Sequence, residues 1–480
     1  MSDSYKKLQS DEYIKKISSK AENLIEYIID YGFDEASVLV TTGSGKNYNI
    51  SKTGTGVSDN SLICSRGYVV RVVKDGKWAE YSLSKVEEED FPYIAKKLNN
   101  TLCLISDTLG SKLTDFDDEN IVGYSEYKVH PGELGSEKII GILENIRNKT
   151  MSISEKVMDV NVYCSYASIA KLHISKRTGG KMIRKEQNTM WMTSFSRVYV
   201  ANGEAIKDYF KVYSNLGGAE VFEDMEKDIS NTVETALQLL ESTPIEPGEY
   251  ECVCTPDVTG MIAHEAFGHG VEMDMFVKKR ALAEEYIGKY VASELITMHD
   301  GAASAQEVAT YFFDDEGVAA KDTVIIDKGI LKSGISDLRS ALKTNTVPTG
   351  NGRRESYKRK AYTRMTNTFF EAGKDKVEDM IASIKYGFLL ENAGSGMEDP
   401  KNWGIQCMVN IAREIKDGKF TGKVFSPIVL TGYVPDLLKS ITMVSDKIEL
   451  SGGGFCGKGY KEWVKVSDGG PYIKAKIRLG

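Results

Sequence analysis

The sequence has little proline and histidine, and it lacks long apolar runs. Its 480 residues include 10 Pro and 5 His, and no stretch of about 18 consecutive apolar residues occurs. The missing apolar run excludes a membrane-spanning helix of ordinary length. The first residues are polar and charged without an apolar core, which predicts that no secretory leader is present. We therefore expect a soluble, cytoplasmic protein.

Disulfide-forming patterns and a positive charge excess are also missing. The seven cysteines are scattered without a C-x-x-C pair, which favours a reducing compartment over a disulfide framework. The net charge of −8 argues against a protein that mainly coats nucleic acid or an anionic membrane. Glycine, by contrast, is plentiful at 44 residues. It is dense in four segments of the second half, 349–356, 392–399, 451–459 and 467–471.

The first half of the chain predicts helices that alternate with groups of strands. Helical spacing of apolar residues predicts helices at 10–31, 85–102, 133–151 and 221–240. Alternating or apolar runs predict strands at 36–40, 62–74, 78–83, 157–175 and 189–200, with a hairpin turn at Asp75-Gly76. Because the order helix, strands, helix occurs twice, we expect two similar sub-layers, at about 1–115 and 116–245.

A polar stretch at 242–248, which contains two prolines, marks the expected domain boundary. Beyond it, the runs at 323–333 and 408–420 contain Asp-Lys-Gly and Lys-Asp-Gly turns typical of hairpins. We predict an α+β protein with an N-terminal α+β domain over 1–245 that contains antiparallel sheets. A β-rich C-terminal domain over 246–480 would carry one helical insertion.

That insertion, at 251–274, contains His264, Glu265 and His269. An apolar strand at 251–254 leads into a helix that opens near Pro256. Zinc hydrolases commonly place two histidines four residues apart, on one face of a helix. Here the spacing is five, which directs the two imidazoles about 140° apart in a regular α-helix. They can converge on one ion if the helix widens into a π-type turn, or if it ends before His269.

Either distortion is eased by Gly268 and Gly270, which flank the second histidine. A catalytic zinc usually takes three protein ligands and leaves a fourth position open. Cys252 and Cys254 alternate with Val253, a pattern typical of a buried strand. The candidates for the third ligand are Glu272, Asp274, the pair Cys252 and Cys254, and Cys456 in its glycine-rich segment.

The segment HEAFGHGVEMD (264–274) resembles the HExxxH signature of the TldD branch of the TldD/PmbA metallopeptidases. The likeness covers nearly the whole second half, through VASEL (291–295), DDEG (314–317), GILKSG (329–334), PTGNGRRESY (348–357), RMTNT (364–368) and FCGKG (455–459). In the first half it rests mainly on 67–82. PmbA-type relatives lack the histidine motif, so the chain is similar to the catalytic subunit.

This resemblance implies a zinc-dependent peptidase that hydrolyses flexible or unfolded peptides. It assigns His264, His269 and Cys456 as the Zn²⁺ ligands and Glu265 as the general base. It also implies a barrel-like C-terminal metallopeptidase domain. A dimer is implied as well, either a heterodimer with a PmbA-type subunit or a homodimer.

The substrate-binding residues that we expect are Arg353, Arg354, Gly453 and Gly454. An extended peptide can add as a strand to an exposed sheet edge, and glycine lets two backbones come close. Such binding relies on main-chain hydrogen bonds and would favour unfolded substrates.

Two other functions stay open. A structural zinc site made of Cys252, Cys254, His264 and His269 would give a non-catalytic scaffold, although its C-x-C spacing departs from the usual one. The six cations within 353–364 would suit a nucleic-acid or gyrase-associated modulator, as family members have been described. The acidic chain and the few aromatic residues near the cluster make nucleic acid the weaker choice, so we interpret the cluster as a solvated face or one that binds a peptide terminus.

Overall fold

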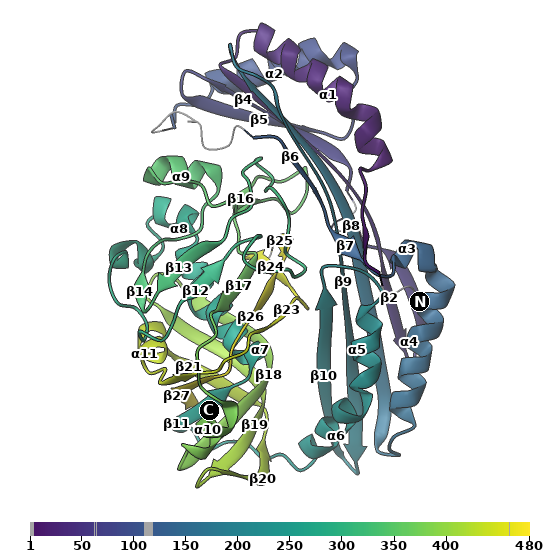
Figure 1. The fold of residues 1–480 in the computed structure, drawn as a ribbon, viewed down its shortest axis with the longest axis vertical. Helices are drawn as coiled ribbons and strands as arrows, with labels where there is room; N and C mark the ends of the chain where they lie inside the picture. Colours follow the sequence, from purple (N-terminus) through teal and green to yellow (C-terminus); the bar gives the residue numbers. More distant parts are fainter. Residues whose placement is uncertain (1–3, 62, 64, 110–118, 460) are drawn as a thin grey trace.

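The computed structural model describes residues 4–61, 63, 65–109, 119–459 and 461–480. A long N-terminal sheet has helices on one face and the C-terminal half of the chain on the other (Figure 1). The predicted α+β class is confirmed. Residues 62 and 64, at the start of the predicted strand 62–74, lie outside the described residues. Within those residues, no helix has both the length and the apolar character needed to cross a membrane.

Two very long antiparallel strands, β8 (Val157–Arg177) and β9 (Ile183–Asn202), form the centre of the N-terminal sheet. The order is β10-β9-β8-β2-β4-β5, with β3 beside β2 and β6 beside β9. The other members are β2 (Glu35–Ser51), β3 (Gly54–Asp59), β4 (Gly67–Lys74), β5 (Lys77–Leu83), β6 (Ile121–Tyr124) and β10 (Ala205–Asn215). A separate small pair joins β1 (Lys6–Lys7) to β7 (Glu126–Tyr127).

Helices cover one face of this sheet in two groups. Leu172 and Ile174 of β8 lie in the core under the first group, and Val160 and Val162 lie in the core under the second. Side chains two residues apart on a strand point to the same face, so both groups pack on one side. The helices are α1 (Glu12–Asp30), α2 (Phe91–Cys103), α3 (Pro131–Leu134), α4 (Ser136–Met151), α5 (Val221–Lys227) and α6 (Ile229–Leu239).

The predicted N-terminal helices and strands are present, but several bounds differ. The helix predicted over 133–151 is broken at Gly135, the strand predicted over 62–74 begins at Gly67, and the strand predicted over 36–40 extends over all of β2. A 3₁₀ turn (Glu88–Asp90) precedes α2, and Pro92 lies in the first turn of that helix, where its missing amide costs nothing. The helix predicted over 221–240 is interrupted at Asp228. Strand β10 was not predicted, because its partly exposed residues give no buried alternating face. The turn at Asp75 and Gly76 has the positive φ angles of the predicted hairpin, 52° and 72°.

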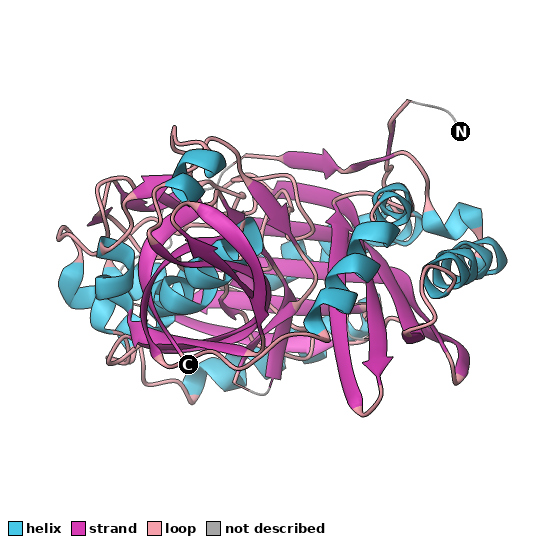
Figure 2. Ribbon diagram, turned by 90° about the horizontal axis from the view of Figure 1, so that it is seen from below, coloured by secondary structure: helices cyan, strands magenta, loops and turns pink. Residues whose placement is uncertain are grey.

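The C-terminal half contains a closed barrel of five strands, seen along its axis in Figure 2. It closes because β27 pairs with both β21 and β11. This confirms the barrel-like prediction. The strands are β11 (Gly248–Cys254), β18 (Tyr386–Asp399), β19 (Gly404–Lys416), β21 (Ile428–Tyr433) and β27 (Ile473–Leu479), with β20 (Lys419–Phe425) and β22 (Met443–Val444) at its sides.

A second sheet lies beside the barrel. Its order is β14 (Ile330–Leu331), β13 (Thr323–Asp327), β12 (Met298–Asp300), β17 (Asn367–Phe370), β26 (Ser467–Gly470) and β23 (Glu449–Ser451). Two hairpins join β15 (Gly352–Arg353) to β16 (Tyr362–Thr363) and β24 (Phe455–Lys458) to β25 (Lys461–Lys465). The helices of this half are α7 (Pro256–Met261), α8 (Met273–Val277), α9 (Leu338–Thr344), α10 (Val377–Ala382), α11 (Val434–Lys439) and a 3₁₀ turn (Leu282–Tyr286).

The expected boundary near residue 245 falls between α6 and β11. Strands from both expected sub-layers join one continuous sheet, β2 pairing directly with β8. The division into two domains stays a prediction. The predicted hairpins at 323–333 and 408–420 are confirmed as β13–β14 and β19–β20.

Candidate metal centre

The histidine motif lies where helix α7 changes its geometry. After α7 the chain forms a π-helix (Ile262–Gly268) and then a 3₁₀ turn (His269–Val271). The amide of His269 donates to the carbonyl of His264, which is the i to i+5 bond of a π-helix. The two imidazole centroids are 5.2 Å apart and their planes are nearly perpendicular, at 89°. Of the two distortions expected from the spacing, the π-turn is confirmed.

The two glycines beside His269 have a different role from the one we predicted. Gly268 has an ordinary helical backbone, with φ −59° and ψ −47°, so the distortion does not depend on its conformational freedom. A Cβ at Gly268 would lie 2.2 Å from Sδ of Met365, and one at Gly270 would lie 2.5 Å from Oε1 of Glu398. Glycine at these two positions therefore lets neighbouring side chains approach the backbone closely.

Cys456 comes from strand β24 and meets both histidines. Its Sγ lies 3.3 Å from Nε2 of His264 and 3.4 Å from Nε2 of His269. The three donor atoms all lie within 4.8 Å of one another. Two imidazole nitrogens and one sulfur form a donor set that suits zinc, and three protein ligands leave a fourth coordination position for water or substrate.

The electrostatics of this cluster also fit a bound cation. Burial lowers the pKa of His264, but the opposing charge of Cys456 raises it, to about 9 overall. Burial raises the pKa of the Cys456 thiol, but the two histidines bring it well below its ordinary value. The pocket therefore favours a thiolate that faces positive charge. A divalent cation held by His264, His269 and Cys456 would supply that charge.

Glu265 lies beside this cluster without belonging to it. Its Oε2 is 3.9 Å from Nε2 of His269, and its side chain lines the adjoining cavity. Burial raises the pKa of Glu265 above its ordinary value, while the charges of the two histidines lower it in part. Strand β18 approaches the side chain closely, since a Cβ at Gly396 would lie 2.5 Å from Cγ of Glu265. The glycine therefore leaves room for the carboxylate.

Of the third-ligand candidates, only Cys456 converges with the histidines among the described residues. Glu272 lies behind His269, with Oε2 3.4 Å from Nδ1, the ring nitrogen that faces away from Cys456. Asp274 forms ion pairs with Lys278 and Lys458. Cys252 and Cys254 are fully buried in the barrel core, so the cluster of the structural-zinc alternative does not form within the described chain.

A cavity of about 1770 Å³ opens beside the cluster, between the N-terminal sheet and the barrel. Its lining includes both histidines, Glu265, Gly453 and Gly454. Strand β10 forms part of the opposite wall, through residues from Tyr209 to Ser214. The cavity therefore adjoins the candidate ligands and two of the four expected substrate-binding residues.

Arg353 and Arg354 are not among the residues that line this cavity. The guanidinium of Arg353 donates to the carbonyls of Met365 and Lys465. That of Arg354 bonds to Glu80 at 2.5 Å in an ion pair with strand β5. These contacts use both side chains within the protein, so we do not carry the two arginines into the proposed substrate site.

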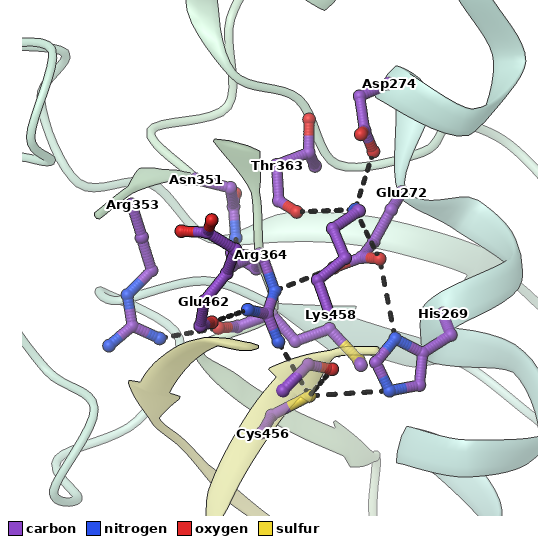
Figure 3. Close-up of polar contacts among 12 residues, drawn as sticks. His269, Glu272, Asp274, Asn351, Arg353, Thr363, Arg364, Cys456, Lys458 and Glu462 are labelled. Atoms are coloured by element: carbon purple, nitrogen blue, oxygen red, sulfur yellow. Dashed lines mark hydrogen bonds and ion pairs between the residues drawn. The ribbon is translucent and has the colours of Figure 1, made fainter. Parts of the chain in front are cut away.

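Two cations in contact with the site were missed by the sequence reasoning. Arg364 is fully buried and donates to Sγ of Cys456 at 2.9 Å (Figure 3). Lys458 binds Glu272 at 2.9 Å and Asp274 at 2.8 Å. The only sequence signal was proximity, because Lys458 follows Cys456 by two residues. The solvated face predicted for the basic cluster is wrong for Arg353, Arg354 and Arg364, whose guanidinium groups bond within the protein. It is confirmed for the exposed Lys358, Arg359 and Lys360.

Comparison with protein families and relatives identifies similar chains. Residues 247–478 match the family model described as the PmbA/TldA metallopeptidase C-terminal domain. A metalloprotease of Methanocaldococcus jannaschii is 28% identical over 461 residues, which cover 94% of this chain and 97% of that protein. A zinc metalloprotease TldD homolog of Saccharolobus solfataricus is 31% identical over 263 residues, which cover 54% of this chain and 56% of that protein.

A solved structure shows the same fold. The structure of TldE from Thermococcus kodakarensis superposes with a TM-score of 0.71 at 20% identity, and the match covers 95% of this chain and 99% of that one. At this identity the likeness concerns the fold alone. Both the N-terminal sheet and the barrel half are covered by the match.

Proposed function

Because the chain belongs to the TldD/PmbA family of metallopeptidases, we propose that it is a zinc-dependent peptidase that cleaves flexible or unfolded peptides. The observation that carries the proposal is the convergence of Nε2 of His264, Nε2 of His269 and Sγ of Cys456 beside Glu265. The printed name of the Saccharolobus solfataricus relative supports zinc as the metal. The site adjoins a cavity large enough for an extended peptide segment.

Each residue has a distinct task in this proposal. His264, His269 and Cys456 would hold the zinc ion. When bound, zinc supplies a Lewis acid that polarises the scissile carbonyl and makes water more acidic. Glu265 takes the proton of the attacking water on its carboxylate and passes it to the nitrogen of the leaving amine. The proton therefore stays on Glu265 between the two transfers.

The geometry of the cavity supports an extended substrate. Two sheet edges border it, since β10 ends the N-terminal sheet and β23 ends the second sheet. A peptide that adds to such an edge is held by main-chain hydrogen bonds, which a folded protein cannot offer. No other heavy atom would lie within 4 Å of a Cβ placed at Gly454, so the backbone there is open to the cavity. These features favour a substrate that is unfolded over the cleaved segment.

Metal removal tests this function. Dialysis against a chelator is expected to abolish cleavage of an unstructured peptide, because it removes the Lewis acid that would polarise the scissile carbonyl. One equivalent of Zn²⁺ should restore the activity, and a folded protein should stay uncut under both conditions. Metal analysis should show that the chelated protein contains less than roughly 0.1 zinc ion per chain. Full activity of that protein would refute zinc dependence.

The close contact between Gly396 and Glu265 gives a second prediction. Gly396→Ala places a methyl group against Cγ of Glu265 and should move the carboxylate without touching the ligands. We expect kcat/KM to fall about 10- to 100-fold while the zinc content is unchanged. The matched control is Gly404→Ala on the neighbouring strand β19, where nothing lies within 4 Å of the new Cβ. Equal activity of both variants would contradict the positioning of Glu265 by this glycine.

We carry the expected dimer forward as a proposal that rests on the same family. A partner of PmbA type or a second copy of this chain would satisfy it. The likeness to TldE concerns the fold alone. The molar mass of the purified chain in solution, measured alone and with a PmbA-type chain, tests it. The cytoplasmic location stays a prediction.

A further inference from the structure

One buried arginine connects the candidate ligand Cys456 to its surroundings. Arg364 is 0% exposed and its guanidinium has three acceptors around it. Nη2 donates to Sγ of Cys456 at 2.9 Å, Nη1 donates to the carbonyl of Glu462, and Nε lies 3.4 Å from Oε1 of Glu272. Figure 3 shows the guanidinium between these groups.

We propose that Arg364 is a positioning residue for the metal centre, which holds the Cys456 thiolate against the two imidazoles and fixes His269 through Glu272. The inference rests on the proposed function, in which Cys456 is a zinc ligand. It assigns a task to a cation that lies outside the first layer of ligands. It also gives part of the basic cluster at 353–364 a role inside the protein.

The second half of this connection runs through Glu272. Its Oε1 faces Nε of Arg364, and its Oε2 lies 3.4 Å from Nδ1 of His269. Lys458 binds the same Oε2 at 2.9 Å. With Nδ1 directed at this carboxylate, the other ring nitrogen, Nε2, faces Cys456. A carboxylate behind a ligating histidine fixes the ring and its tautomer, and such outer contacts influence metal affinity.

The shape of the guanidinium suits this position. Arginine offers five N–H donors in a rigid plane, so one side chain can donate to a sulfur and a carbonyl while its charge faces a carboxylate. A lysine ammonium has the same charge on a flexible chain and lacks this planar fork. Leaving the thiolate and Glu272 buried without the facing cation would cost free energy, because two negative groups would lose a positive neighbour.

Arg353 provides a natural comparison within the same cluster. The strand β25, which pairs with the strand of Cys456, accepts hydrogen bonds from both arginines. Arg364 bonds to the carbonyl of Glu462 and Arg353 to the carbonyl of Lys465. The side chain of Arg353 therefore bonds to a main-chain carbonyl of the hairpin, whereas that of Arg364 bonds both to such a carbonyl and to the sulfur of Cys456. Variants of these two arginines therefore distinguish a loss of support for the hairpin from a direct effect on the candidate ligand Cys456.

The experiment measures the metal centre directly in the full-length chain. Zinc affinity is determined by competition with a chromophoric chelator, and the Co²⁺-substituted protein reports the sulfur ligand through its sulfur-to-cobalt absorption. Arg364→Gln is expected to raise the zinc Kd about 10- to 100-fold and to shift that absorption. Arg364→Lys should give an intermediate Kd. Arg353→Gln should leave the absorption unchanged, and the exposed Lys360→Gln should match the wild type in both.

Thermal unfolding of each variant shows whether it is folded. The proposal is overturned if Arg364→Gln keeps the wild-type Kd and spectrum, or if Arg353→Gln and Arg364→Gln raise the Kd equally with an unchanged spectrum. If Arg364→Gln does not fold, Arg364→Lys decides, and a wild-type Kd and spectrum in that variant overturn the proposal. A wild-type chain that binds no zinc, or a Cys456→Ser variant that keeps it, would refute the proposed function instead.

Discussion

Replacing Glu265 with glutamine is expected to lower kcat/KM for peptide cleavage by about 10²- to 10⁴-fold while the zinc content stays at the wild-type level. Glutamine keeps the size of the side chain but cannot accept the proton of the attacking water. Because Glu265 is not one of the three converging donors, the substitution removes the base and leaves the ligands in place. The measurement combines initial rates on an unstructured peptide with metal analysis of the same preparation.

The control for this experiment is Glu378→Gln, the same chemical change at an exposed position on helix α10. Its activity and zinc content should equal those of the wild type. Wild-type activity of Glu265→Gln would show that another group accepts the proton. Loss of zinc from Glu265→Gln would place the carboxylate among the ligands and contradict its position outside the three converging donors.

Replacing Cys456 with serine is expected to remove zinc and, with it, the peptidase activity. A serine hydroxyl has nearly the same shape, but it stays protonated near neutral pH and is a poor ligand compared with a thiolate. The loss of affinity should exceed the roughly 10- to 100-fold effect typical of residues outside the first layer of ligands. Metal analysis and chelator competition on the folded variant measure it.

Cys252→Ala is the comparison for this variant. Cys252 is buried in the barrel core and lies outside the converging group, so its zinc content should match the wild type. The reverse result, zinc lost from Cys252→Ala and kept by Cys456→Ser, would favour the structural-zinc alternative. The zinc contents of the two cysteine variants thus distinguish the proposed catalytic centre from the structural-zinc scaffold.

The candidate ligands were predictable from the sequence because their signal is local or belongs to a family motif. The five-residue spacing of His264 and His269 required a distorted helix, and the π-turn provides it. The third position could not be chosen from the spacing, since Glu272 and Asp274 are closer in sequence than Cys456. The choice of Cys456 came from the family resemblance, and its convergence with the histidines depends on a contact across 192 positions.

The surroundings of the ligands could not be predicted for a related reason. Arg364 belongs to a run of cations that usually indicates a solvated surface, and its contacts with Glu272, Cys456 and the carbonyl of Glu462 compensate its burial. Those partners are distant in sequence. The strand β10 was missed because its residues lack a buried alternating face, although it forms a wall of the cavity. Helices and hairpins with strong local patterns were, in contrast, correctly placed.

The barrel closes through β27, which pairs with both β11 and β21, and Cys456 lies only a short distance before that strand. During translation the histidines emerge from the ribosome first, and the third candidate ligand follows almost two hundred residues later. A chain that is still being synthesised therefore has neither a closed barrel nor a complete set of ligands. If the chain is the proposed peptidase, the order of synthesis would delay its activity until the last barrel strand and all three candidate ligands have been made, and nearby unfolded nascent chains would not be cleaved by it before then.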